Sequence, residues 1–156
     1  MKNNKKGFTL IELLAVIVIL AIIALIATPI ILQIITKARR SASIDSLYGV
    51  MAATKSTYME TLLDTKQMEL PAYIECNGTD CQIYHATPMP DATNPTTYEK
   101  GDAQTAATTV KFSGSIPTGD LIIDKEGRFL PTESSKVIKV NGFDCSIKAN
   151  DTVECK

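Results

Sequence analysis

The chain has 156 residues, of which 45% are hydrophobic and 21% charged, and its formal net charge is −1 at pH 7. This length suits one domain with an appendage. Three lysines lie within the first seven residues, and without their charges the remainder stands at −4, which argues against a general nucleic-acid binder.

A long apolar run follows these lysines. Between residues 8 and 36 the only charged side chain is Glu12. A helix of about 20 apolar residues crosses a hydrocarbon core of about 30 Å, so the run predicts a membrane-spanning helix. It is about twice as long as the apolar region of a secretory signal peptide, which disfavours a conventional signal. Basic residues on both sides, namely Lys2, Lys5, Lys6, Lys37, Arg39 and Arg40, leave the orientation open.

The boundary between the basic and apolar segments reads Lys5-Lys6-Gly7-Phe8-Thr9-Leu10-Ile11-Glu12. This motif resembles the class III-type leader and processing site of type IV pilins and pseudopilins, and residues 14–40 are most similar to Gram-positive members. The resemblance implies that a prepilin peptidase cuts between Gly7 and Phe8. It also implies N-methylation of Phe8 and a C-terminal domain on the outer side of the membrane.

The resemblance gives two further residues a role. Glu12 would pair with the Phe8 amine of a neighbouring subunit, because a carboxylate and an amine within a membrane both need partners. The alternative is a Glu12 that simply lies at headgroup depth. Pro29 matches the family's helix-bending proline. Since proline removes a backbone hydrogen bond, a kink is expected whether or not it serves assembly.

The helix is expected to continue to about Asp64. Over residues 36–64 apolar side chains recur at helical spacing, which predicts an amphipathic second half that packs on a sheet. Gly49 weakens this helix slightly. The predicted apolar stripe consists of Ile44, Leu47, Tyr48, Met51, Tyr58, Met59, Leu62 and Leu63.

Two further regions follow. Residues 65–109 are punctuated by proline and glycine and are expected to be a variable loop region, with a minor strand around Gln82-Ile83-Tyr84. Residues 110–156 predict an antiparallel sheet with a C-terminal segment bounded by cysteines, and Asn141-Gly142 is a strong hairpin signal. The candidate strands cover residues 110–113, 121–124, 128–130, 136–140, 144–148 and 152–155. The expected fold class is therefore α+β, a long N-terminal helix packed on a small antiparallel sheet, as in the pilin fold.

Four cysteines, Cys76, Cys81, Cys145 and Cys155, all follow the apolar run. An even number in an exported region favours disulfides, for which three connectivities exist. The simplest is Cys76–Cys81 with Cys145–Cys155, each closing a short loop. A zinc site is an alternative, although the usual C-x2-C spacing is missing. Free thiols are the third possibility.

No catalytic motif stands out, so the sequence predicts neither an enzyme nor a cofactor. Asp120, Asp124 and Glu126 cluster around Gly127, where turn chemistry is expected rather than calcium binding, because the EF-hand spacing is absent. No metal site is predicted. The single histidine, His85, is expected on the surface.

These observations predict a structural subunit of a type IV pilus filament. It would be a single-pass precursor in the cytoplasmic membrane and then part of a surface filament. Its partners would be other pilin subunits, the prepilin peptidase and the membrane assembly platform. A pseudopilin of a type II secretion or DNA-uptake apparatus is the first alternative. A membrane-anchored binding module that does not polymerise is the second.

Overall fold

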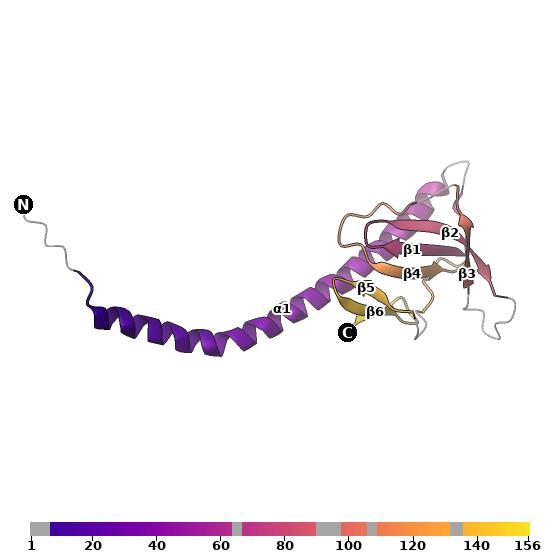
Figure 1. Cartoon of the computed structure of the whole chain (residues 1–156). Coiled ribbons are helices and arrows are strands. Elements are labelled where there is room, and N and C mark those ends of the chain that lie inside the picture. The colour runs from indigo at the N-terminus through magenta and orange to yellow at the C-terminus, as the bar shows by residue number, and fades with distance from the viewer. Residues whose placement is uncertain (1–6, 64–66, 90–97, 106–108, 132–135) are drawn as a thin grey trace, which may run out of the picture. The chain divides into compact units, whose positions relative to one another are not determined.

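The structure is a computed structural model that describes residues 7–63, 67–89, 98–105, 109–131 and 136–156. The chain divides into two compact units, Met1–Ala38 and Arg39–Lys156. The described residues form one helix, which enters both units, and seven strands (Figure 1). The elements are α1 (Leu10–Thr61), β1 (Ala72–Asn77), β2 (Cys81–Pro88), β3 (Tyr98–Ala103), β4 (Thr118–Ile123), β5 (Ile138–Val140), β6 (Phe143–Ile147) and β7 (Val153–Cys155).

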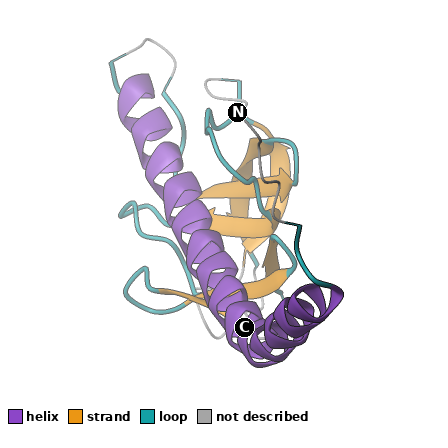
Figure 2. Cartoon of the chain, turned by 90° about the vertical axis from the view of Figure 1, so that its left-hand side faces the viewer, coloured by secondary structure: helices purple, strands orange, loops and turns teal. Residues whose placement is uncertain are grey.

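The strands form one antiparallel sheet in the order β3-β2-β1-β4-β5-β6-β7. The part of α1 in the second unit lies against one face of this sheet (Figure 2). Alternate strand residues point toward the helix, as expected for a sheet with one buried face. The predicted α+β class is confirmed. The core combines Leu47, Val50 and Met51 of α1 with Ile74, Ile83, Leu121, Ile123, Ile138, Val140 and Ile147 of the sheet.

The buried face of α1 is a stripe of Ser43, Leu47, Val50, Met51, Thr54 and Thr61. The Ser43 and Thr54 hydroxyls donate to the carbonyls of Arg39 and Val50, so their burial leaves no donor unpaired.

The predicted stripe was partly wrong. Met59 is 63% exposed and Leu63 is 93% exposed. Successive helical residues are rotated by about 100°, so the pattern at Met59 begins a different face from the one that holds Leu47. The helix also ends at Thr61, and Asp64 lies outside the described residues.

The hairpin predictions at the C-terminus are confirmed. Asn141 and Gly142 join β5 to β6 with φ angles of 52° and 87°, the left-handed conformation that Asn-Gly hairpin turns require. Strands β6 and β7 form the second predicted hairpin.

The expected loop region over residues 65–109 needs correction, because it contains β1, β2 and β3, of which only a minor strand at residues 82–84, inside β2, was predicted. Pro71, Gly78 and Pro88 lie at the ends of strands β1 and β2, whereas Gly101 lies inside β3. Ile74 and Cys76 of β1 face the core at a spacing of two, and so do Cys81 and Ile83 of β2. The Asn77 side chain closes the turn between them by accepting hydrogen bonds from the Thr79 and Asp80 amides.

Two expected strands are also absent as strands. Residues 110–113 contribute only a hydrogen bond from the Val110 amide to the Cys81 carbonyl. Residues 128–130 form an isolated bridge at Phe129. In the first segment the Phe112 ring packs on the helix at Gly49, where a Cβ would lie 2.4 Å from the ring. Gly49 thus provides a notch that its low helix propensity did not reveal.

Candidate assembly and processing site

The helix α1 begins with a capping box formed by Thr9 and Glu12. The Thr9 hydroxyl accepts a hydrogen bond from the Glu12 amide at 3.3 Å, and Glu12 Oε2 accepts from the Thr9 amide at 2.8 Å. The Thr9 hydroxyl also donates to the same Oε2 at 2.8 Å. These contacts satisfy amides that the first helical turn otherwise leaves unpaired. Glu12 therefore has a local partner within its own chain.

The capping box leaves one carboxylate oxygen of Glu12 available. Within the described part of the chain, all side-chain hydrogen bonds of Glu12 use Oε2, and no ion pair neutralises the group. A charge in an apolar environment is costly unless it is paired. The carboxylate is thus held in a fixed position at the start of the helix with one oxygen free for a partner.

Gly7 and Phe8 precede the cap. A Cβ at Gly7 would meet no atom within 4 Å among the residues placed by the structure, so no packing within this chain explains the glycine. Phe8 is 90% exposed. The remainder of the expected leader, residues 1–6, lies outside the described residues. The two positions are accessible to a partner, which is what a cleavage site requires.

None of the described residues covers the apolar surface of α1 in the first unit. By length and composition α1 could cross a membrane, and the 18-residue apolar stretch on which this rests is 0% buried. This is consistent with membrane anchoring, because lipid or other helices must cover such a surface in the cell. The exposed residues include Ile11, Leu14, Ile17, Ile22, Leu25, Ile26, Ile30, Leu32 and Ile34.

Pro29 lies inside this helix, which continues on both sides of it. Since proline lacks an amide hydrogen, it cannot donate the usual bond to the preceding turn. The neighbouring Thr28 hydroxyl donates to the Ala24 carbonyl at 2.6 Å. That contact is of the kind that often bends helices, and the kink at Pro29 stays a prediction.

The four cysteines form two disulfides. Cys76 is bonded to Cys81 across β1 and β2, and Cys145 to Cys155 across β6 and β7. The pairing is the simplest that the sequence allows, and it replaces the zinc and free-thiol alternatives. All four cysteines are at most 6% exposed. Both bridges therefore belong to the core of the sheet domain.

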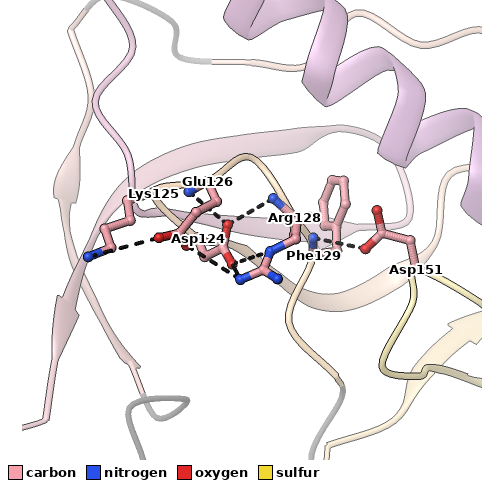
Figure 3. A network of polar contacts seen from close by, with 6 residues as sticks. All are labelled: Asp124, Lys125, Glu126, Arg128, Phe129 and Asp151. Atoms are coloured by element: carbon pink, nitrogen blue, oxygen red, sulfur yellow. Dashed lines mark hydrogen bonds and ion pairs between the residues drawn. The ribbon is translucent and has the colours of Figure 1, made fainter.

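The acidic residues around Gly127 have separate partners. The Asp124 carboxylate accepts hydrogen bonds from the amides of Glu126 and Arg128 and from Arg128 Nε (Figure 3). Burial alone would raise the pKa of Asp124, but hydrogen bonds and the charge of Arg128 outweigh burial and hold this pKa below its usual value. Asp120 instead accepts a hydrogen bond from Tyr73 at 2.5 Å. Asp124 thus organises a turn, as expected.

Tyr73, the hydrogen-bond partner of Asp120, also has a shifted pKa. Its side chain is buried, and burial together with the hydrogen bond to Asp120 raises the pKa of its hydroxyl. His85 was expected in a loop but lies in β2, partly exposed, with Nδ1 3.4 Å from Glu69 Oε2.

Sequence reasoning missed a set of contacts that fastens the C-terminal hairpin to the helix. Asp151 forms an ion pair with Lys55 at 2.9 Å. Its carboxylate also accepts a hydrogen bond from the Phe129 amide (Figure 3). The Tyr48 hydroxyl accepts a hydrogen bond from the Val153 amide. These partners are 96, 22 and 105 residues apart, so no local pattern announces them.

Comparison with known families agrees with the N-terminal geometry. Residues 2–28 match the family model described as the prokaryotic N-terminal methylation motif. No curated protein and no solved structure matches the chain. The long apolar N-terminal helix that carries this motif, followed by an antiparallel sheet, forms a pilin-like fold. The motif supports a type IV pilin-like or pseudopilin protein, and it points to a structural role rather than catalysis.

Proposed function

We propose that the protein is a structural subunit of a type IV pilus filament. The observation that carries this proposal is the combination of the methylation motif with an apolar helix whose surface is uncovered. A prepilin peptidase would remove residues 1–7, and Phe8 would then be N-methylated. The mature helix would leave the membrane and pack against the helices of neighbouring subunits.

The capping box supports an assembly role for Glu12. Cleavage creates an amine at Phe8, next to a helix start where the Glu12 carboxylate is already fixed by Thr9. Pairing of this carboxylate with the Phe8 amine of a neighbour would neutralise two charges inside an apolar core. It would also fix the axial position of one subunit against the next. A bend at Pro29 would let the helices of neighbouring subunits pack in a curved filament core.

The test separates the charge of Glu12 from its capping function. Glu12→Gln keeps a capping-box side chain but removes the charge, whereas Thr9→Val removes the cap and keeps the charge. The variants are expressed in the native host, and the amount of this protein in sheared surface filaments is measured. We expect Glu12→Gln to abolish incorporation while membrane levels stay normal, and Thr9→Val to reduce incorporation only in part.

Normal incorporation of Glu12→Gln would contradict the pairing. If the wild-type protein never enters any fibre, the filament role itself fails and a non-polymerising module remains. If it enters only short fibres made by overproduction of a secretion or DNA-uptake apparatus, the pseudopilin alternative holds. Gly7→Val tests processing separately, because it should leave an unprocessed, slower-migrating precursor.

A further inference from the structure

Three exposed basic side chains follow the apolar stretch of α1, namely Lys37, Arg39 and Arg40. None of them forms an ion pair within the described residues. The chain beyond them is acidic, because residues 41–156 hold ten basic and 16 acidic residues. The first of these acids, Asp45, lies on the same helix, is exposed, and is likewise unpaired in the part of the chain that the structure describes.

Arg40 and Asp45 do not neutralise each other within one chain. Side chains of an α-helix meet at spacings of three or four residues, whereas these two are five apart. No residue of opposite charge lies three or four positions from either of them. The face of α1 that packs on the sheet carries Ser43, Leu47 and Val50, and the exposed Asp45 is not part of it. Both charges therefore remain available to a second copy of the chain.

The proposed pairing of Glu12 with the Phe8 amine of a neighbour fixes an offset between two parallel copies of α1. The offset is about four residues, or about 6 Å along the axis. Since α1 continues from Leu10 to Thr61, and any bend at its proline occurs in both copies, the same offset applies farther along. It places Arg40 of the copy that supplies the amine level with position 44 of the other copy, one residue before Asp45. An arginine side chain easily spans the remaining distance of about 1.5 Å.

The order of charges along the helix also repeats. A basic group precedes an acidic one at Phe8 and Glu12 after cleavage, and again at Arg40 and Asp45. The second pair follows the first by 32 or 33 residues, which is about nine turns of an α-helix. Nearly a whole number of turns thus separates two pairs of the same polarity.

We propose that Arg40 of one copy forms an ion pair with Asp45 of its neighbour in the filament. This inference rests on the proposed function and adds a second charged contact beyond the apolar stretch. A guanidinium can offer two parallel donors to a carboxylate, which favours one relative position of the two groups. Because exposed ion pairs add little affinity while facing like charges are costly, the pair mainly selects the register of neighbouring helices.

The test expresses charge-reversed variants in the native host and measures their amount in sheared surface filaments, with processed protein in the membrane as the control for folding. Arg40→Glu and Asp45→Lys each place like charges opposite one another and should lower the filament-bound amount about ten-fold or more. Both substitutions in one chain should restore it. Co-expression of the two single variants should also restore it, because each copy then meets an opposite charge on its neighbour, which a pair within one chain would not allow.

Arg39→Glu is the matched control, because it reverses the same charge one position away. The offset brings Arg39 level with Ser43, so its filament-bound amount should stay within about two-fold of wild type. Equal losses in Arg39→Glu and Arg40→Glu would assign the basic residues to lipid headgroups and overturn the pair. Failure of the co-expressed variants to recover would overturn it too.

The filament role and the ion pair fail in distinguishable ways. If Arg40→Glu and Asp45→Lys enter filaments normally while Glu12→Gln does not, the ion pair alone is wrong and the proposed function stands. If the wild-type protein is absent from filaments, the proposed function is wrong and the ion pair falls with it.

Discussion

The apolar first unit and the sheet domain obey different physical constraints. In Met1–Ala38 the large side chains of α1 are exposed, and their partners must come from outside the chain. In Arg39–Lys156 the buried side chains meet one another across helix and sheet, and both disulfides lie among them. Substitutions in the first unit should therefore change assembly, whereas those of buried residues in the second should change stability.

The largest effect on stability is expected from the C-terminal disulfide. Replacing Cys145 and Cys155 together by alanine frees a loop of about ten residues, which costs about 2–3 kcal/mol in the chain-entropy model. Thermal unfolding of the full-length chain in micelles should show a clear decrease in Tm. Processing at Gly7 should be unchanged. Loss of processing would contradict the expectation that substitutions of buried residues in the second unit change only stability.

The next effect is expected at Gln104, which is 1% exposed. Its side-chain amide donates to the Glu69 and Tyr84 carbonyls and accepts from the Glu69 amide. Gln104→Leu removes all three bonds, and we expect about 2 kcal/mol of lost stability. Gln82→Leu, at an exposed glutamine in β2, is the control and should change stability by less than about 0.5 kcal/mol. Both variants are measured by denaturant titration. Equal losses of stability in Gln104→Leu and Gln82→Leu would show that the buried Gln104 amide contributes no more than an exposed glutamine.

The notch at Gly49 should give a smaller loss. Gly49→Ala gains about 1 kcal/mol of helix propensity but pushes against the Phe112 ring, which costs about 1–3 kcal/mol. The net expectation is a loss of about 1 kcal/mol. In the double variant Gly49→Ala with Phe112→Ala the clash is gone, so alanine at position 49 should then stabilise relative to glycine. A stabilising single variant would contradict the notch.

Acid should weaken the turn at Asp124. Because its pKa is lowered in the folded protein, the ionised carboxylate adds stability above the unfolded-state pKa, and this contribution is lost as pH falls through the folded-state value. Asp124→Asn should therefore flatten the fall of Tm on acidification below about pH 4. An unchanged pH profile would assign the acid sensitivity to other carboxylates.

The smallest effect on stability is expected in the first unit. Ile22 is 55% exposed, so Ile22→Ala should leave the free energy of unfolding of the sheet domain within about 0.5 kcal/mol of wild type. The same substitution should reduce the amount of protein in filaments. A stability loss as large as that of Gln104→Leu would show that the comparison between the units is wrong.

The sequence predicted local features better than distant contacts. The apolar run, the Gly7-Phe8 boundary and the Asn141-Gly142 hairpin depend on neighbouring residues, so their patterns are visible in the chain. Within residues 65–109 only a minor strand around residues 82–84, inside β2, was predicted, and β1 and β3 were missed because prolines obscured short stretches of alternating burial. The anchoring of Asp151 to Lys55 joins residues 96 apart, and the seating of Phe112 on Gly49 likewise depends on tertiary packing.

Mass spectrometry of sheared surface filaments tests the central claim most directly. The account predicts abundant protein whose N-terminal peptide begins at Phe8 and carries a methyl group on its amine, with Cys76–Cys81 and Cys145–Cys155 oxidised. A protein that is absent from filaments, or present there with residues 1–7 still attached, would contradict the account of α1 as an assembly helix.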